Sequence, residues 1–558
     1  MPVPRSAARS RIASSLAVAT ALALFAFPGV ASAAVTATFA AGVLTVSSDA
    51  ADGIAITCVG GVVKVNGADP TPAADCAAVT AIDVTGGPGA NVISLVGVTV
   101  VSPGAVFPNV AAVDVGGGAG DDTITGSDID DDLFGDEDDD RIIGDNNPPG
   151  TRDNSVGGSG RDTLVWNPGD GDDVNEGGSE IDTIEVNGGG GGEVFTVAPS
   201  TTAGRIAFDR TGPTPPGPFN LDIGTAERLD LNAGGGDDSL TSTTANGFAL
   251  DIDGGNDNDT LDGGDGPDLI TGGAGNDRII GDNNPGGTRD NSVGGDGDDT
   301  LVWNPGDGDD TNEGGAGNDT IEVNGGGGGE VFTVKPSTTA GRVLFDRTGP
   351  TPPGPFNLDI GTSERLVLNA GDGDDRITGA NGLAGRIAST FNGDGGNDRI
   401  TGTDGADRLT GGAGNDVIRS RDTRADRVIC GAGFDLARVD RRDIVSGCTI
   451  VIGGRQRVRL LGNTARVTLG RAVLRLRCVA TRRCSGTVRL LRGTRSLGTA
   501  RFTATRSRTK IVRVKLNRRG RRLVAGASRS GVRVTAQLNA RDGAGNGWRT
   551  TKRIRLRR

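Results

Sequence analysis

Aspartate residues recur at a nine-residue spacing in three parts of this 558-residue chain, as at Asp259, Asp268 and Asp277. The chain contains no His, which excludes His-dependent acid–base catalysis, Ser-His-Asp triads and His-coordinated metals. A bound metal ion would therefore have to be held by oxygen atoms. Calcium, which accepts about six to eight oxygen ligands, is the ion that suits this chemistry.

The aspartates belong to a glycine-rich sequence of nine residues that is repeated in tandem. Residues 254–280 read GGNDNDTLD, GGDGPDLIT and GGAGNDRII, and residues 393–419 and 117–143 hold three further copies each. The shared pattern is G-G-x-G-x-D-x-U-x, in which U is aliphatic. It resembles the calcium-binding nonapeptide of the repeats-in-toxin (RTX) family, over roughly residues 117–419 with interruptions.

The resemblance implies an all-β fold, a parallel β-roll or β-helix solenoid. In such a roll the first six positions of the nonapeptide form a turn, the last three form a short strand, and two nonapeptides complete a coil. Glycine permits the positive φ angles of the tight turns. The aliphatic residue at position eight should then stack into a narrow core, formed by Ile124, Leu133, Ile142, Leu261, Ile270, Ile279, Ile400, Leu409 and Ile418.

The resemblance also implies that the aspartates at position six are calcium ligands. Residues eighteen apart should overlie each other, as Asp259 overlies Asp277, and such close carboxylates repel unless a cation lies between them. The alternative is that these acids only keep the protein soluble. The ligands expected in the tandem runs are Asp122, Asp131, Asp140, Asp259, Asp268, Asp277, Asp398, Asp407 and Asp416. Isolated copies of the repeat add Asp162, Asp182, Asp238, Asp299, Asp319 and Asp375.

A longer repeat surrounds the short one, because a block from about Leu133 to Asp238 recurs as about Ile270 to Asp375 with an offset of 137 residues. Each block interleaves the nonapeptides with alternating apolar and polar segments, which we expect to be strands. In the second block these segments are residues 330–334, 341–347, 356–361 and 364–369. Trp166 and Trp303 could be exposed binding residues, but we favour capping or packing roles.

The N-terminal part of the chain predicts export. Residues 1–33 resemble a secretory signal peptide, with a single membrane anchor as the competing interpretation, and no other segment is apolar enough to span a bilayer. Residues 34–116 predict a β region with degenerate repeats. Six cysteines suit an oxidising compartment and form three near-neighbour couples, namely Cys58/Cys76, Cys430/Cys448 and Cys478/Cys484. We hypothesise that the first two couples link adjacent coils near the two ends of the solenoid.

The repeat region, residues 117–448, ends in an altered repeat that should cap the last coil. Residues 449–558 have a different composition, with 31 Lys and Arg residues and one acid, a net charge of +30; the rest of the chain carries −43. Short alternating strands with Arg-rich turns predict an immunoglobulin-like β-sandwich. Its charge favours an anionic cell-wall or extracellular polymer, or the acidic part of the same chain, as partner. Export and the scarcity of aromatic residues argue against nucleic acid.

These features together predict a secreted or cell-surface calcium-binding repeat protein without enzymatic activity. Calcium outside the cell would neutralise the acidic coils and drive their folding. Two alternatives remain open at this point. One is an adhesin or a toxin-like surface protein. The other is a secreted polysaccharide-degrading enzyme, because parallel β-solenoids can carry such activity and the coils offer carboxylate pairs.

Overall fold

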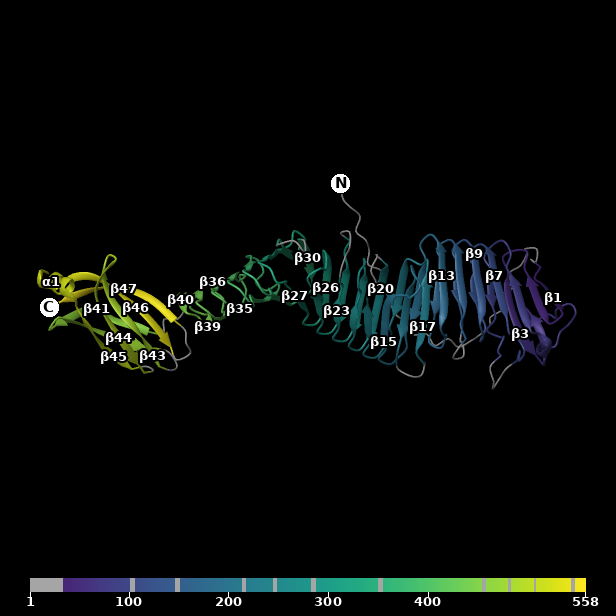
Figure 1. Ribbon diagram of the computed structural model, residues 1–558, viewed down its shortest axis with the longest axis horizontal. Coiled ribbons are helices and arrows are strands. Elements are labelled where there is room, and N and C mark those ends of the chain that lie inside the picture. Colours follow the sequence, from purple (N-terminus) through teal and green to yellow (C-terminus); the bar gives the residue numbers. More distant parts are fainter. Residues whose placement is uncertain are drawn as a thin grey trace.

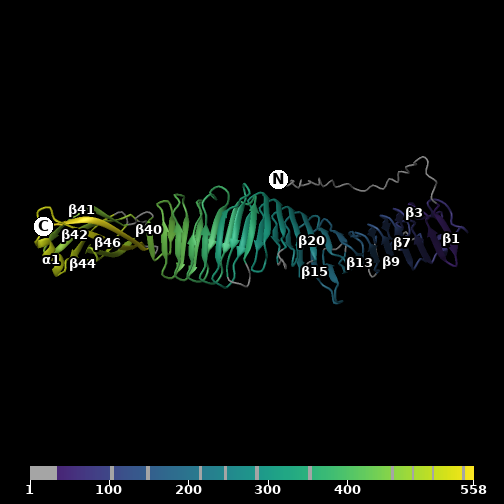
Figure 2. The same ribbon diagram turned by 90° about the horizontal axis from the view of Figure 1, so that it is seen from above.

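The computed structural model of the protein describes residues 34–100, 106–145, 151–212, 217–243, 248–282, 288–349, 355–453, 458–479, 483–505, 508–542 and 547–558. The expected signal peptide, residues 1–33, lies outside these ranges. The molecule is a long rod, with a separate β domain at its C-terminal end (Figures 1 and 2). Nearly all regular structure is strand, as the sequence predicts.

Two long sheets, A and B, form the two faces of the rod, and successive strands of the chain alternate between them. In spatial order sheet A contains β1 (Thr36–Ala40), β2 (Val43–Ser47), β5 (Ala81–Thr85), β7 (Val113–Ala119), β9 (Asp131–Glu137), β11 (Asn154–Ser159), β13 (Asp173–Ser179), β17 (Phe219–Gly224), β16 (Ile206–Arg210), β15 (Val194–Pro199), β19 (Ser239–Ser242), β21 (Thr260–Asp262), β23 (Arg278–Ile280), β25 (Thr300–Trp303), β27 (Thr320–Asn324), β31 (Arg365–Asn369), β33 (Ala388–Asn392), β35 (Arg408–Ala413), β37 (Arg427–Ala432) and β39 (Ile444–Ser446).

Sheet B contains β4 (Val62–Val65), β3 (Gly53–Val59), β6 (Val92–Ser94), β8 (Thr123–Thr125), β10 (Arg141–Ile143), β12 (Thr163–Trp166), β14 (Thr183–Asn187), β18 (Arg228–Asn232), β20 (Ala249–Asn256), β22 (Leu269–Ala274), β24 (Asn291–Asp296), β26 (Asp310–Ala316), β30 (Phe356–Gly361), β29 (Val343–Arg347), β28 (Val331–Pro336), β32 (Arg376–Gly379), β34 (Arg399–Thr401), β36 (Val417–Ser420), β38 (Leu436–Val439) and β40 (Ile450–Gly453). Apart from hairpins at the N-terminal end and inside the two duplicated blocks, the strands within each sheet are parallel. The chain is therefore a β-roll solenoid.

The core of the rod is the expected aliphatic ladder. Ile124 of β8 stands opposite Ile142 of β10, which in turn stands opposite Leu164 of β12, although the second step includes an insertion and spans 22 residues. All nine aliphatic residues predicted for this ladder are at most 1% exposed. The core continues without a break into the N-terminal region, where β5 pairs with β7 in parallel register.

The duplicated blocks differ in the sheet that receives their inserted strands. In the first block β15, β16 and β17 form an antiparallel meander in sheet A, whereas the equivalent β28, β29 and β30 lie in sheet B. One block therefore advances the solenoid by an odd number of half-coils, and the two copies face opposite sides of the rod. Trp166 and Trp303 are 2% exposed and stack on Phe219 and Phe356, which confirms a packing role.

The disulfides join the three cysteine couples that we expected. Of the two bonds that were predicted to link adjacent coils, only one does so. Cys430 of β37 is bonded to Cys448, just after the neighbouring β39, so this bond joins stacked coils. Cys58 of β3 is bonded to Cys76 in the short 3-10 turn η1 (Cys76–Ala78). Because β4 returns antiparallel to β3 and the segment before Cys76 pairs with the start of β4, the Cys58–Cys76 bond ties this segment back to β3 and does not join stacked coils.

The C-terminal domain contains β41 (Val458–Thr468), β42 (Arg471–Cys478), β43 (Cys484–Arg492), β44 (Arg495–Ala504), β45 (Thr509–Lys515), α1 (Arg518–Ala525), β46 (Val532–Asp542) and β47 (Gly547–Arg557). It has its own apolar core, and β47 also pairs with β40 at the end of the rod. Neighbouring strands are antiparallel except at β41 and β47. An immunoglobulin-like topology stays a prediction for this domain.

Helix α1 was not expected, because the alternating pattern around it predicts only strands. Its N-terminus is capped by the Asn517 side chain, which accepts a hydrogen bond from the backbone N–H of Gly520. Val524 is buried, and four arginines precede it in the helix. No helix among the described residues is long and apolar enough to cross a membrane, and α1 has eight residues.

Candidate metal centre

The fifteen predicted ligands lie in two columns, one along each edge of the rod. An acid of the A column immediately precedes or begins a strand of sheet A, and an acid of the B column stands in the same place before a strand of sheet B. The A column contains Asp131, Asp238, Asp259, Asp277, Asp299, Asp319 and Asp407, and the B column contains Asp122, Asp140, Asp162, Asp182, Asp268, Asp375, Asp398 and Asp416. All fifteen side chains are buried.

A regular hydrogen bond links the members of each column. The backbone N–H of Asp122 donates to Oδ1 of Asp140 at 2.8 Å, and the N–H of Asp259 donates to Oδ1 of Asp277 at 2.8 Å. The expected overlap of residues eighteen apart is therefore present. The same bond joins the isolated copies across longer coils, as from Asp162 to Asp182 and from Asp299 to Asp319, so the insertions do not break the columns.

The second carboxylate oxygen distinguishes these aspartates from ordinary turn residues. In thirteen of the fifteen, Oδ2 is buried and has no hydrogen-bond partner. The exceptions are Asp131 and Asp407, whose second oxygens accept bonds from the backbone N–H of Ser127 and Thr403. A buried carboxylate oxygen without a partner is costly, which makes these positions suited to a cation.

The glycines of the repeat leave the space in which this oxygen lies. A Cβ atom at Gly272, position one of its repeat, would collide with Oδ2 of Asp277 and with the carbonyl oxygen of Gly294. Gly273 has a φ of 108°, and a Cβ there would collide with the carbonyl oxygen of Gly255 in the preceding coil. Turn carbonyls thus lie close to the carboxylates. This all-oxygen set of potential donors fits calcium.

Burial also disfavours the charged form of these carboxylates when no cation is present. Desolvation is the main cause that raises the pKa of Asp140, Asp259 and Asp398 to about 7, with neighbouring carboxylates adding to it. For Asp268 the same causes raise the pKa to about 8. The columns therefore require either protons or a metal cation near neutral pH.

Comparison with known families identifies the repeats. The sequence model of the RTX calcium-binding nonapeptide repeat matches residues 116–147, 253–284, 367–382 and 390–421. The chain carries RTX calcium-binding repeats. Repeats of this kind bind Ca²⁺, so calcium is the ion of the matched segments. No curated protein matches the chain. The matched RTX segments include all nine aspartates of the tandem runs and Asp375, whereas Asp162, Asp182, Asp238, Asp299 and Asp319 lie between them.

Seven aspartates that extend the columns escaped the sequence prediction, four of them inside the duplicated blocks and three toward the C-terminal cap. Asp153 and Asp290 receive the N–H bonds of Asp131 and Asp268, and donate in turn to Asp173 and Asp310. The nonapeptide pattern hid these four aspartates because position eight of their repeats is not aliphatic but holds a serine or an asparagine, namely Ser155, Ser292, Asn175 and Asn312. In the regular repeat the glycine at position one stands five residues before the aspartate at position six. A search that allowed an insertion between these two positions would have found Asp153 and Asp290. Asp426, Asp435 and Asp443 continue the columns toward the C-terminal cap.

Two coils carry a cation of their own. Glu193 occupies position six of GGGGGEVFT, and its N–H donates to Oδ1 of Asp238, so it is a member of the A column. Its Oε1 accepts bonds from Nε of Arg210 at 3.0 Å and from Nη2 at 2.5 Å, and both side chains are 1% exposed. Glu330 and Arg347 repeat the arrangement in the second block. A guanidinium here neutralises an acid of the column, whereas none of the fifteen expected ligands forms an ion pair with a described residue.

Proposed function

We propose that this protein is an extracellular rod whose RTX coils fold on calcium and which carries a basic binding domain at its end. The columns of buried carboxylates, with thirteen unpartnered oxygens among the fifteen expected ligands, are the observation that carries the proposal. Without calcium these carboxylates would repel one another inside a thin core. Calcium at the concentration found outside cells would neutralise them and hold neighbouring coils together.

Circular dichroism and small-angle X-ray scattering of the full chain test the folding step. In chelator we expect loss of most of the β signal and a larger radius of gyration, and added calcium should restore both. Magnesium, which prefers a small octahedral site, should restore them poorly. A chain that stays equally compact and equally β-rich after complete metal removal would contradict the proposal.

An extracellular location is supported by the cysteines. All six described cysteines are in disulfides, which persist in oxidising compartments. The signal-like residues 1–33 agree with export. Secretion of the full-length precursor from a bacterial host, followed by N-terminal sequencing of the released protein, tests this; retention of residues 1–33 would argue against a cleaved signal.

We propose a structural or interaction role and not an enzymatic one. A cavity of about 1280 Å³ lies between the rod and the C-terminal domain and is lined by Arg441, Arg442, Arg459 and Arg549. Asp440 is the one carboxylate among its described lining residues, so this cavity lacks the acid pair that glycoside hydrolysis needs. Assays on pectin-like and peptidoglycan substrates should show no turnover.

The basic domain is proposed to bind an anionic polymer at a cell surface. Arg533 stands directly opposite Arg555, and Arg471 opposite Lys515, on neighbouring strands. Like charges in such positions are destabilising, and no ion pair joins any two described residues of this domain. A polyanion would relieve this repulsion.

Binding to dextran sulfate, with neutral dextran as the control, tests this part of the proposal. We expect salt-sensitive binding to dextran sulfate alone, weakened when Arg533 and Arg555 are both replaced by Ser. The full chain in calcium should bind, because the acidic columns are then neutralised. Equal retention on both polymers would contradict an electrostatic partner and leave the rod as a calcium-binding structure without this contact. Attachment of cells instead of free polymer would favour the adhesin alternative.

A further inference from the structure

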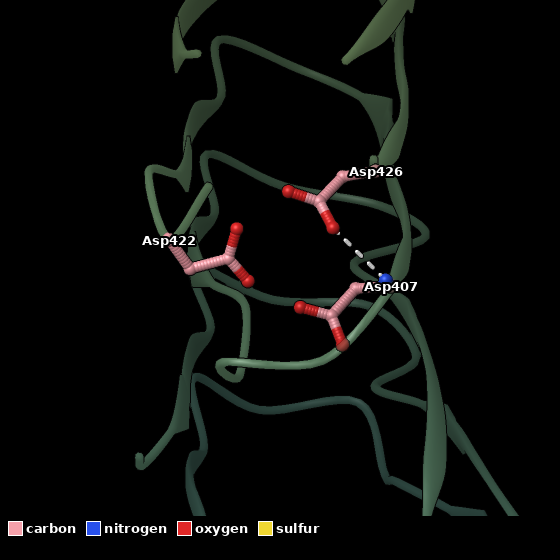
Figure 3. A group of neighbouring side chains, drawn as sticks. All are labelled: Asp407, Asp422 and Asp426. Carbon is pink, nitrogen blue, oxygen red and sulfur yellow. Dashed lines mark hydrogen bonds between the residues drawn. The ribbon is translucent and has the colours of Figure 1, made fainter. Parts of the chain in front are cut away.

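A group of three carboxylates near the C-terminal end of the rod departs from the nonapeptide pattern. Asp407 and Asp426 are consecutive members of the A column, and Asp422 lies in the turn between β36 and β37. One carboxylate oxygen from each of the three lies within 4.8 Å of the other two. Figure 3 shows Asp422 facing the other two side chains across the interior of the turn.

Two of the three side chains point an unpartnered oxygen into this space. Asp426 is 1% exposed, and its Oδ1 accepts the N–H of Asp407 at 3.0 Å while its Oδ2 has no partner. Asp422 is fixed by the N–H of Arg424, which donates to its Oδ1 at 2.8 Å, and its Oδ2 is also buried and without a partner. Asp407 accepts two bonds from Thr403, but each carboxylate oxygen retains a second lone pair.

Three arginines, Arg419, Arg421 and Arg438, line the same cavity as Asp422, but none of them pairs with the three carboxylates. No lysine or arginine among the described residues forms an ion pair with Asp407, Asp422 or Asp426. The repeat that carries Asp422 in its turn is one residue longer than a nonapeptide. It has no glycine between Ser420 and Asp426. The matched RTX segment ends at residue 421, so Asp422 and Asp426 lie outside it.

We propose that Asp407, Asp422 and Asp426 form a calcium site with three carboxylates, in which Asp407 of the last matched repeat is joined by two aspartates that lie beyond the matched segment. A coil of the regular pattern supplies one carboxylate from each of two adjacent turns, and here the lengthened turn adds a third. Higher ligand charge strengthens calcium binding, so this site should fill before the regular ones. The inference rests on the proposed calcium-dependent folding, and it adds that calcium binding starts at the C-terminal end of the rod.

Hydrogen exchange of the full chain, followed by mass spectrometry during a calcium titration, separates this site from the others. In the native chain we expect residues 404–430 to become protected at a lower calcium concentration than residues 254–280. Asp422→Asn keeps the oxygen that accepts the Arg424 N–H and removes one charge, so the chain should still fold. It should raise the calcium midpoint of residues 404–430 by about tenfold or more and leave that of residues 254–280 unchanged.

The control is Asp83→Asn, which removes an exposed carboxylate of β5 far along the rod. It should shift neither midpoint. If Asp422→Asn leaves the midpoint of residues 404–430 unchanged while residues 254–280 still respond, the three-carboxylate site is wrong and calcium-dependent folding stands. If neither segment of the native chain responds to calcium, the proposed function itself fails.

Discussion

Glu193 and Arg210 form an ion pair in which each side chain is 1% exposed, whereas Asp238, the next acid of the A column, forms no ion pair with a described residue. The pair and its copy, Glu330 with Arg347, divide the coils into two classes. Coils with an internal guanidinium are neutral by themselves. Coils with unpartnered aspartate oxygens are neutral only with a proton or a metal ion.

Arg210→Met should destabilise the first meander strongly, because it leaves the buried carboxylate of Glu193 without its cation. Loss of one partner of a buried pair costs about 3–5 kcal/mol. We expect a lower unfolding midpoint in urea for the full chain in calcium, and Arg347→Met should act alike in the second block. The double variant Glu193→Gln with Arg210→Met should recover much of the loss, and equal destabilisation in the single and double variants would show that the charge is not the cause.

Asp277→Asn should weaken calcium binding by the coils around residues 254–280. The substitution keeps the oxygen that accepts the N–H of Asp259 but removes the charge. We expect the calcium midpoint of folding in this segment to rise by about tenfold, measured by hydrogen exchange. Asp296→Asn, at the exposed last residue of the neighbouring β24, is the matched control and should have no effect. A rise of the same size in both variants would mean that overall charge decides the response.

The metal-free protein should become less stable as the pH rises from about 4 to 8. Asp140, Asp259 and Asp398 have a pKa of about 7 in the folded chain, above the ordinary aspartate value of 3.8. The folded state therefore binds more protons than the unfolded state in this range. The stabilisation is fully present below the pKa of the unfolded chain and is lost as the pH rises through the pKa of the folded chain. Calcium affinity should increase as the pH rises, because calcium binds the ionised carboxylates.

Urea unfolding of protein freed of metal on a chelating resin, at several pH values, measures this dependence. The same series in saturating calcium is the control, because bound calcium keeps the carboxylates ionised. Stability that increases with pH in the metal-free series would contradict the assignment of desolvated carboxylates to the columns.

Gly272→Ala should damage a calcium coil, because its Cβ atom would occupy the space of the Asp277 Oδ2 and collide with the Gly294 carbonyl oxygen. We expect a loss of about 1–3 kcal/mol in unfolding free energy in calcium, together with weaker calcium binding. Gly327→Ala is the matched control, since nothing lies within 4 Å of its added Cβ. Equal effects in the two variants would show that chain flexibility, and not space beside the carboxylate, is what these glycines provide.

The regular part of the fold was predictable from the sequence, because a fixed nine-residue repeat determines which residues stack over one another in successive coils. The aliphatic ladder, the overlap of Asp259 and Asp277, and the strands of the meanders all follow from spacing or alternation. Partners that are distant in sequence were not predictable. Arg210 neutralises Glu193 only because the meander folds back over seventeen residues, and Asp422 meets Asp407 only because one turn is lengthened. Helix α1 depends on a local cap that interrupts a strand-like pattern.

The exchange of sheets between the two duplicated blocks has a consequence for recognition at a distance. The first meander is part of sheet A and the second is part of sheet B, so two nearly identical surfaces lie on different sheets of the rod. A molecule that recognised the meander in sheet A would find the second copy in sheet B. The duplication has thus placed one copy of the meander on each sheet, whereas an even number of half-coils would have placed both copies on the same sheet.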